Sequence, residues 1–189
     1  MSLQTTSSQT VGPYLHIGLT WLNTDNLVGP GVTGEKVTLE GRILDGDGKP
    51  VGDALVEIWQ ANAYGKYAHP DDVQDMPLED GFKGFGRVPT DGNGQFKFTT
   101  IKPGRVPAPD GGVQAPHINV CILMRGMLKQ LVTRVYFPGD PANAGDEGLR
   151  CVPASRRDTL IAKQVAGRPG ALEWTVILQG EGETVFFDC

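Results

Sequence analysis

The chain lacks long apolar runs and any excess of positive charge. None of its apolar stretches approaches the ~20 residues needed to cross a bilayer in a chain of 189 residues. Residues 1–10 have neither the basic start nor the apolar centre of a signal peptide, so we expect a cytoplasmic protein. The formal net charge is −5, which disfavours nucleic acid and anionic membranes as partners because both bind basic surfaces. Small molecules and other proteins remain as partners.

Cysteine and histidine are scarce. Cys121, Cys151 and Cys189 show no C-x-x-C spacing, so neither a disulfide framework nor a zinc site is indicated, and we expect reduced thiols. The sequence has only three histidines, too few and too scattered for a metal site made of histidine alone. It also lacks a G-x-S-x-G nucleophile elbow, a phosphate-binding loop and an H-E-x-x-H motif. No self-sufficient catalytic constellation is present.

Helical patterns are nearly absent, whereas short alternating segments are frequent. Glycine (26) and proline (14) together make 40 of 189 residues, or roughly 21% against an average of about 12%, which predicts many turns. Segments with strand character are 15–19, 37–43, 55–60, 95–101, 118–124, 131–137, 172–178 and 183–187. These features predict a single all-β domain over residues 1–189, an antiparallel β-sandwich with long loops.

Three local patterns refine this prediction. Asp45-Gly46-Asp47-Gly48 is typical of a reversal, so the strands on either side are expected to form a hairpin-like unit. Residues 153–163 predict one short helix with Ser155 as a possible N-cap. A polar, Asp-rich stretch from Asn62 to Phe85 predicts a long loop, and loops of this length are usually functional or face a partner.

Residues 115–120 offer half of a metal-binding arm. On a strand, His117 and Asn119 point to one face while Ile118 and Val120 point to the other. A His-x-His pair at this spacing could supply two ligands to one metal. The second position is an amide, however, whose neutral oxygen is a poor ligand for ferric iron.

Two further features have both a functional and a structural interpretation. Gly12-Pro13-Tyr14 places an aromatic ring on a rigid bend, which fits either a docking segment or a loose terminus. Arg125 follows the apolar run 118–124, where its guanidinium could recognise a carboxylate or simply extend into water.

Four segments taken together resemble the intradiol ring-cleaving dioxygenases, in consistent order from about Gln9 to the C-terminus. They are W-Q-A-N-A-Y-G-K-Y (59–67), T-I-K-P-G (100–104), A-P-H-I-N (115–119) and G-E-T-V-F-F-D (182–188). The resemblance implies a β-sandwich. It also implies a ferric ion held by two tyrosinates and two histidines, which binds a catechol-type substrate and activates it for attack by O2.

The resemblance also shows where this chain departs from the catalytic pattern. The first tyrosine falls on Tyr67 and the second on Val106, and the two histidines fall on His117 and Asn119. Two of the four ligands are therefore absent, and the aliphatic side chain of Val106 has no lone pair. We expect this chain to bind no metal and to have no catalytic residues of its own, which excludes a homomeric enzyme with substituted ligands.

In heteromeric members of this family, an α chain without iron pairs with a homologous β chain that carries Fe(III), in a higher (αβ)n assembly. The resemblance implies that this chain is such an α subunit and lends residues to the partner's substrate pocket. These residues are Thr10, Gly12, Pro13, Tyr14 and Arg125, and segment 1–14 is expected to dock on the partner. The alternative is a catalytically inactive β-sandwich that serves as a binding or scaffold protein.

Overall fold

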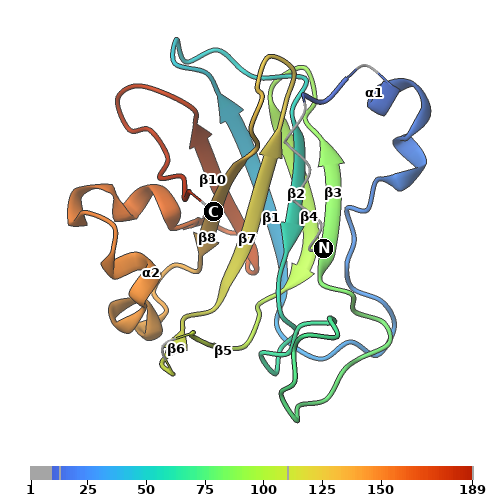
Figure 1. Ribbon diagram of the computed structural model, residues 1–189, viewed down its shortest axis with the longest axis vertical. Coiled ribbons are helices and arrows are strands. Elements are labelled where there is room, and N and C mark those ends of the chain that lie inside the picture. Colours follow the sequence, from blue (N-terminus) through green and yellow to red (C-terminus); the bar gives the residue numbers. More distant parts are fainter. Residues whose placement is uncertain (1–9, 13, 110, 189) are drawn as a thin grey trace, which may run out of the picture.

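Two four-stranded sheets form the body of the protein (Figure 1). The computed structural model describes residues 10–12, 14–109 and 111–188, without the side chains of Leu15 and His16. One sheet has the order β3 (Phe85–Pro89), β2 (Leu55–Trp59), β7 (His117–Leu123), β8 (Leu131–Tyr136). The other has the order β4 (Gln95–Ile101), β1 (Lys36–Leu44), β10 (Ala171–Ile177), β9 (Lys163–Gln164). A small ribbon pairs β5 (Val106–Pro107) with β6 (Val113–Gln114).

The core lies between the two large sheets and follows the alternation of the sequence. Along β7, Ile118, Val120 and Ile122 are buried, whereas the residues between them face outward. Along β1 and β10, every second residue is likewise buried. The same cluster contains apolar side chains from both sheets, so each sheet buries one face against the other. The predicted β-sandwich is confirmed.

The connection after β1 differs from the hairpin that we predicted. The reversal at residues 45–48 does form, because the Gly48 amide donates to the Asp45 carbonyl at 3.1 Å and the Asp45 amide donates to Lys49. The chain then crosses to the other sheet, where β2 pairs with β3 and β7. Strand β1 instead pairs antiparallel with β4 and parallel with β10, so one strand pair in the sandwich is parallel.

The helices are short, and several expectations about single segments were wrong. The elements are α1 (Tyr14–Gly18), η1 (Thr20–Leu22), η2 (Pro141–Gly145), α2 (Glu147–Arg150) and η3 (Ala154–Leu160). The predicted helix at 153–163 is the 3-10 helix η3, whose N-cap is Pro153 without a side-chain hydrogen bond, so Ser155 does not cap it. The expected strand at 15–19 belongs to α1, and 183–187 contributes only the isolated bridge from Phe187 to Val132. Strand β3 was missed because it begins inside the segment interpreted as a loop.

The two ends of the sandwich carry different features (Figure 1). Helix α1 and the turn between β7 and β8 lie at one end, shown at the top. The β5–β6 ribbon and the long loop that follows β2 lie at the other end. In the described part of the chain, no helix combines the length and the apolar character needed to cross a membrane.

Candidate functional site

Strand β7 presents His117 and Asn119 on the outer face of its sheet. Both residues lie on the face opposite to buried Ile118, as the sequence predicted. His117 is 3% exposed, although it faces outward, and Asn119 is half-buried. The segments around β7 therefore cover this part of the sheet.

A tight turn after β2 places Tyr67 against Asn119. The side-chain oxygen of Asn62 accepts hydrogen bonds from the amides of Tyr64 and Lys66, both at 3.0 Å, which fixes the turn. The Tyr67 ring stacks on Trp59 with 5.7 Å between ring centroids. The side-chain amide of Asn119 then donates to the Tyr67 hydroxyl at 3.4 Å. Two of the four predicted ligand positions are thus in contact.

A buried ion pair holds the loop that follows this turn. The Lys66 ammonium lies 3.4 Å from the Asp72 carboxylate, and it also donates to the carbonyl oxygens of Asp72 and Gln74. The other carboxylate oxygen of Asp72 accepts from the Tyr67 amide at 2.8 Å. These contacts and hydrogen bonds from the Tyr67 and Gln74 amides keep the pKa of Asp72 below its usual value, despite the opposing effect of burial. The loop is therefore fixed close to Tyr67.

Val106 begins the short strand β5 and is buried. The turn before it packs on the turn before Tyr67, since the Gly104 amide donates to the Asn62 carbonyl at 2.9 Å. A Cβ at Gly65, whose φ is +81°, would lie 2.0 Å from the Arg105 carbonyl oxygen. Only glycine permits this approach. The second tyrosine position therefore belongs to the same end of the sandwich, but it is filled by an isopropyl group.

His117 is held as a neutral ring. Its Nδ1 lies 2.8 Å from the Ala115 carbonyl oxygen, and because a carbonyl can only accept, Nδ1 carries the proton. Burial, and after it the nearby charge of Arg134, lower the pKa of His117 to about 4. The ring therefore stays neutral near pH 7.

The buried carboxylate of Asp146 holds the residues just before β7 in place through hydrogen bonds. It is 0% exposed and accepts from the Ala115 amide at 2.8 Å, from the Tyr136 hydroxyl at 2.9 Å and from the Leu149 amide at 2.9 Å. Tyr136 in turn packs on the His117 ring at 5.7 Å. Burial raises the pKa of Tyr136 to about 12, so it remains a hydrogen-bond donor.

Arg134 is the residue of this site that the sequence did not reveal. It lies on β8 directly opposite Asn119, and its Nε donates to the Asn119 side-chain oxygen at 3.1 Å. Burial raises the pKa of Tyr67, while the hydrogen bond from Asn119 and the charge of Arg134 oppose this effect. The strand register was the missing information, because the two residues are 15 positions apart in sequence.

This set of side chains does not fit ferric iron. Tyr67 and His117 could each supply one ligand, but Val106 has no donor atom, and the oxygen of Asn119 already accepts a hydrogen bond from Arg134. In the described part of the chain, no group of three or more histidine, cysteine, aspartate or glutamate side chains could hold a metal ion. We name Tyr67, Val106, His117 and Asn119 the degenerate metal site.

Two of the other predicted site residues, Thr10 and Arg125, lie close together at the opposite end of β7. The Thr10 hydroxyl donates to the Met124 carbonyl at 3.2 Å and accepts from the Gly126 amide at 3.1 Å. These two bonds involve the residues on either side of Arg125. The Arg125 side chain is 82% exposed and forms an ion pair with Asp53. The N-terminal segment and Arg125 are therefore neighbours, although they are more than 110 residues apart.

The remaining members of this group are Gly12, Pro13 and Tyr14. Gly12 is exposed, and the Tyr14 side chain is 79% exposed at the start of α1. Pro13 and residues 1–9 of the docking segment lie outside the described residues, as does Cys189. Cys121 and Cys151 are free thiols, as expected.

The degenerate metal site and the contact between Thr10 and the turn of Arg125 lie at opposite ends of β7. Since β7 spans seven residues at about 3.3 Å per residue, these two sites lie on the order of 20 Å apart.

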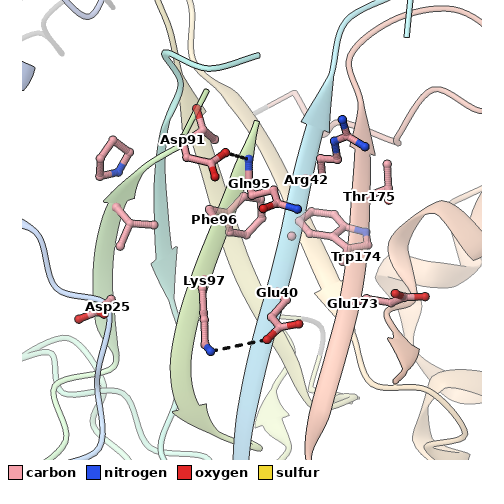
Figure 2. A pocket seen from close by; sticks show the side chains of 14 residues that line it. Asp25, Glu40, Arg42, Asp91, Gln95, Phe96, Lys97, Glu173, Trp174 and Thr175 are labelled. Atoms are coloured by element: carbon pink, nitrogen blue, oxygen red, sulfur yellow. Dashed lines mark hydrogen bonds and ion pairs between the residues drawn. The ribbon is translucent and has the colours of Figure 1, made fainter. Parts of the chain in front are cut away.

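A shallow depression on the outer face of the other sheet holds none of these residues (Figure 2). It has a volume of about 750 Å³ and is lined by residues of β1, β3, β4 and β10, which include charged side chains such as Glu40 and Lys97 and the apolar Phe96 and Trp174. Glu40 forms ion pairs with Lys97 at 3.6 Å and with Arg168 at 2.7 Å, and Figure 2 shows the first of these. The charges neutralise one another across the strands, as is usual for a solvated sheet face.

Comparisons with known proteins agree with the fold. A protein-family profile described as Dioxygenase matches residues 21–180. The α chain of protocatechuate 3,4-dioxygenase from Burkholderia cepacia is 45% identical over 99% of this chain and 98% of its own length. The β chain from the same organism is 39% identical over 80% of this chain and 67% of its own length.

A solved structure supports the same assignment. The dioxygenase domain of a fusion with a carbohydrate-binding protein, from Streptomyces sp. SirexAA-E, superposes with a TM-score of 0.63. It is 26% identical, and the match covers 86% of this chain and 89% of that domain. The family profile and the 45% identity to an α chain over nearly the whole length place this chain in the intradiol ring-cleaving dioxygenase family.

Proposed function

We propose that this chain is the α subunit of a protocatechuate 3,4-dioxygenase and works only together with a homologous β subunit that holds Fe(III). The whole enzyme opens the ring of 3,4-dihydroxybenzoate between its two hydroxyl-bearing carbons. Both atoms of O2 enter the product, 3-carboxy-cis,cis-muconate. The iron of the β subunit supplies the activation of the catechol, and we propose that the assembly is an (αβ)n oligomer in the cytoplasm.

One observation carries the proposal. The chain matches an α chain of this enzyme over almost its whole length, while its own ligand positions do not fit iron. A chain that had simply lost its function would be expected to lose its docking surface as well. Here the degenerate metal site occurs together with hydrogen bonds between Thr10 of the N-terminal segment and the turn that carries Arg125, at the other end of β7.

The surface around this cluster is unusually apolar. Four side chains at this end are more than three-quarters exposed: Tyr14, Ile17, Trp21 and Leu128. Exposed aromatic and aliphatic groups of this size mark interaction sites in soluble proteins, and aromatic side chains are enriched in the centres of interfaces. We propose that the β subunit covers these side chains.

Within the interface, Thr10, Gly12, Pro13 and Tyr14 line the edge of the partner's substrate pocket, and Arg125 supplies positive charge to it. In the ion pair of Arg125 with Asp53, the Arg125 side chain is 82% exposed, whereas the Asp53 side chain is 29% exposed and its paired oxygen is buried. The exposed guanidinium can turn towards a carboxylate of the substrate or of the partner, and Asp53 then loses its cation. A fork of five donors suits that task.

Co-expression tests the proposal. The chain is produced alone, with the β chain from the same operon or genome, and with a β chain that lacks the α-facing surface. We expect a stable complex, the visible colour of tyrosinate bound to Fe(III), and cleavage of protocatechuate only for the intact pair. An isolated chain that carries one Fe(III) and cleaves the ring unaided would refute the proposal. A chain that never associates with the β subunit would support the scaffold interpretation instead.

A further inference from the structure

The degenerate metal site contains a positive charge of its own. Arg134 projects from β8 onto the outer face of the sheet and lies opposite Asn119 in the register. Its Nε donates to the Asn119 side-chain oxygen at 3.1 Å, and one terminal nitrogen donates to the Gln114 side-chain oxygen at 2.7 Å. The guanidinium also lies 5.9 Å from the centroid of the Phe187 ring. It therefore connects β8 with β7, with β6 and with the C-terminal segment.

The contacts of Arg134 turn Asn119 away from any metal. The amide oxygen is the only side-chain atom of Asn119 that could coordinate a cation, and it accepts a hydrogen bond from the guanidinium. The nitrogen of the same amide points to the Tyr67 hydroxyl and to the Trp59 carbonyl, at 3.4 and 3.3 Å. The site thus presents N–H donors where a metal would need lone pairs.

The surroundings also accommodate the charge electrostatically. A Cβ added at Gly148 would lie 3.3 Å from a terminal nitrogen of Arg134 and 3.1 Å from the Asp146 carboxylate. A buried anion and the guanidinium therefore flank the same glycine. A half-buried cation with hydrogen-bond acceptors and a nearby carboxylate is stable without further partners, whereas a second, highly charged cation beside it would be repelled.

We propose that Arg134 is a resident cation that has replaced the metal of this site: its guanidinium binds Asn119, which in turn contacts Tyr67, and it excludes Fe(III). The presence of Val106 in place of a tyrosine and of Asn119 in place of a histidine is then only part of the reason why this chain binds no iron. The inference uses the family membership and the described contacts, and it does not depend on the identity of the partner subunit.

Restoring the ligands tests this idea directly. Val106→Tyr with Asn119→His gives the full set of two tyrosines and two histidines, while Arg134 stays in place. The same pair with Arg134→Gln removes the charge but keeps a hydrogen-bonding side chain. Arg42→Gln, in the same double-substituted chain, is the matched control, because Arg42 is an exposed arginine on a strand of the other sheet. Each full-length chain is incubated with Fe(III) citrate and separated from unbound iron by gel filtration.

We expect the chain with Arg134→Gln to retain at least about ten-fold more Fe(III) than the double variant, with tyrosinate-to-iron absorption in the visible. The Arg42→Gln control should retain no more than the double variant. Equal iron retention with and without Arg134 overturns the proposal.

Chemical rescue keeps the idea testable if the substituted chains do not fold. Arg134→Ala alone should lower Tm, and low millimolar guanidinium should raise Tm again relative to the same concentration of NaCl. The wild-type chain and Arg42→Ala should show no such rise. Absence of rescue in Arg134→Ala means that the site does not bind a cation of this kind, and the proposal fails.

Discussion

Asp146 gives the sharpest test of how the degenerate site is held in place. Its carboxylate is 0% exposed and accepts three hydrogen bonds, from the Ala115 amide, the Tyr136 hydroxyl and the Leu149 amide. Asp146→Ala leaves these three donors without their acceptor. A hydrogen bond to a charged group contributes about 1.5–3 kcal/mol, and water that enters the vacated space recovers part of this. We expect the free energy of unfolding to fall by about 3–5 kcal/mol.

Urea denaturation of the full-length chain, followed by both fluorescence and circular dichroism, measures this loss. Tyr136→Phe is the matched comparison, because it removes one of the three donors and should cost about 1.5–3 kcal/mol. Asp47→Ala controls for the loss of an exposed carboxylate and should change the stability by less than about 0.5 kcal/mol. In the combined Asp146→Ala and Tyr136→Phe variant, the two effects should not add, since the hydroxyl already lacks its acceptor. A loss below about 1 kcal/mol for Asp146→Ala would refute the reasoning.

Three further predictions concern Arg125, Lys66 and His117. In the assembled enzyme, Arg125→Ala should raise KM or lower kcat for protocatechuate, because it removes the positive charge proposed to face the substrate pocket, and unchanged kinetics would remove that role. Lys66→Met leaves the buried Asp72 carboxylate unpaired and should destabilise the fold by about 3–5 kcal/mol, with faster proteolysis between residues 66 and 80; equal protease resistance would contradict this. The pKa of His117 is about 4 in the folded chain against about 6.5 when unfolded, so the unfolded state binds the proton first. Stability should therefore fall by about 3 kcal/mol from pH 6.5 to pH 4, and urea titrations of His117→Gln should lack this part of the pH dependence.

The features that could be predicted from the sequence are those that depend on neighbouring residues. The alternation along residues 118–124 predicted which side chains of β7 are buried and placed His117 and Asn119 on the opposite face. The absence of lone pairs at Val106 follows from its side chain alone. The β-sandwich follows from many short alternating segments separated by glycine and proline. Each of these inferences uses the local geometry of the chain.

Other features depend on which strands become neighbours, and these were mispredicted or missed. The reversal at 45–48 formed, but β1 and β2 separated into different sheets because β1 pairs with β10, which is more than 125 residues away. Strand β3 was missed because it starts with Phe85 inside a polar segment and gains its apolar contacts only from the core. Segment 153–163 formed a 3-10 helix that lacks a side-chain cap at its N-terminus.

By itself, the sequence determined that this chain is a β-sandwich, because alternation is a property of neighbouring residues, and its resemblance to the intradiol dioxygenases predicted that two of the four ferric ligands are absent. Only the tertiary structure decided what took the place of the missing ligands. Arg134 reaches Asn119 across a strand pair, and Thr10 reaches the turn that carries Arg125. Such contacts form only when segments that are distant in sequence pack around a common core. The residues that meet are therefore determined by the packing of the whole chain.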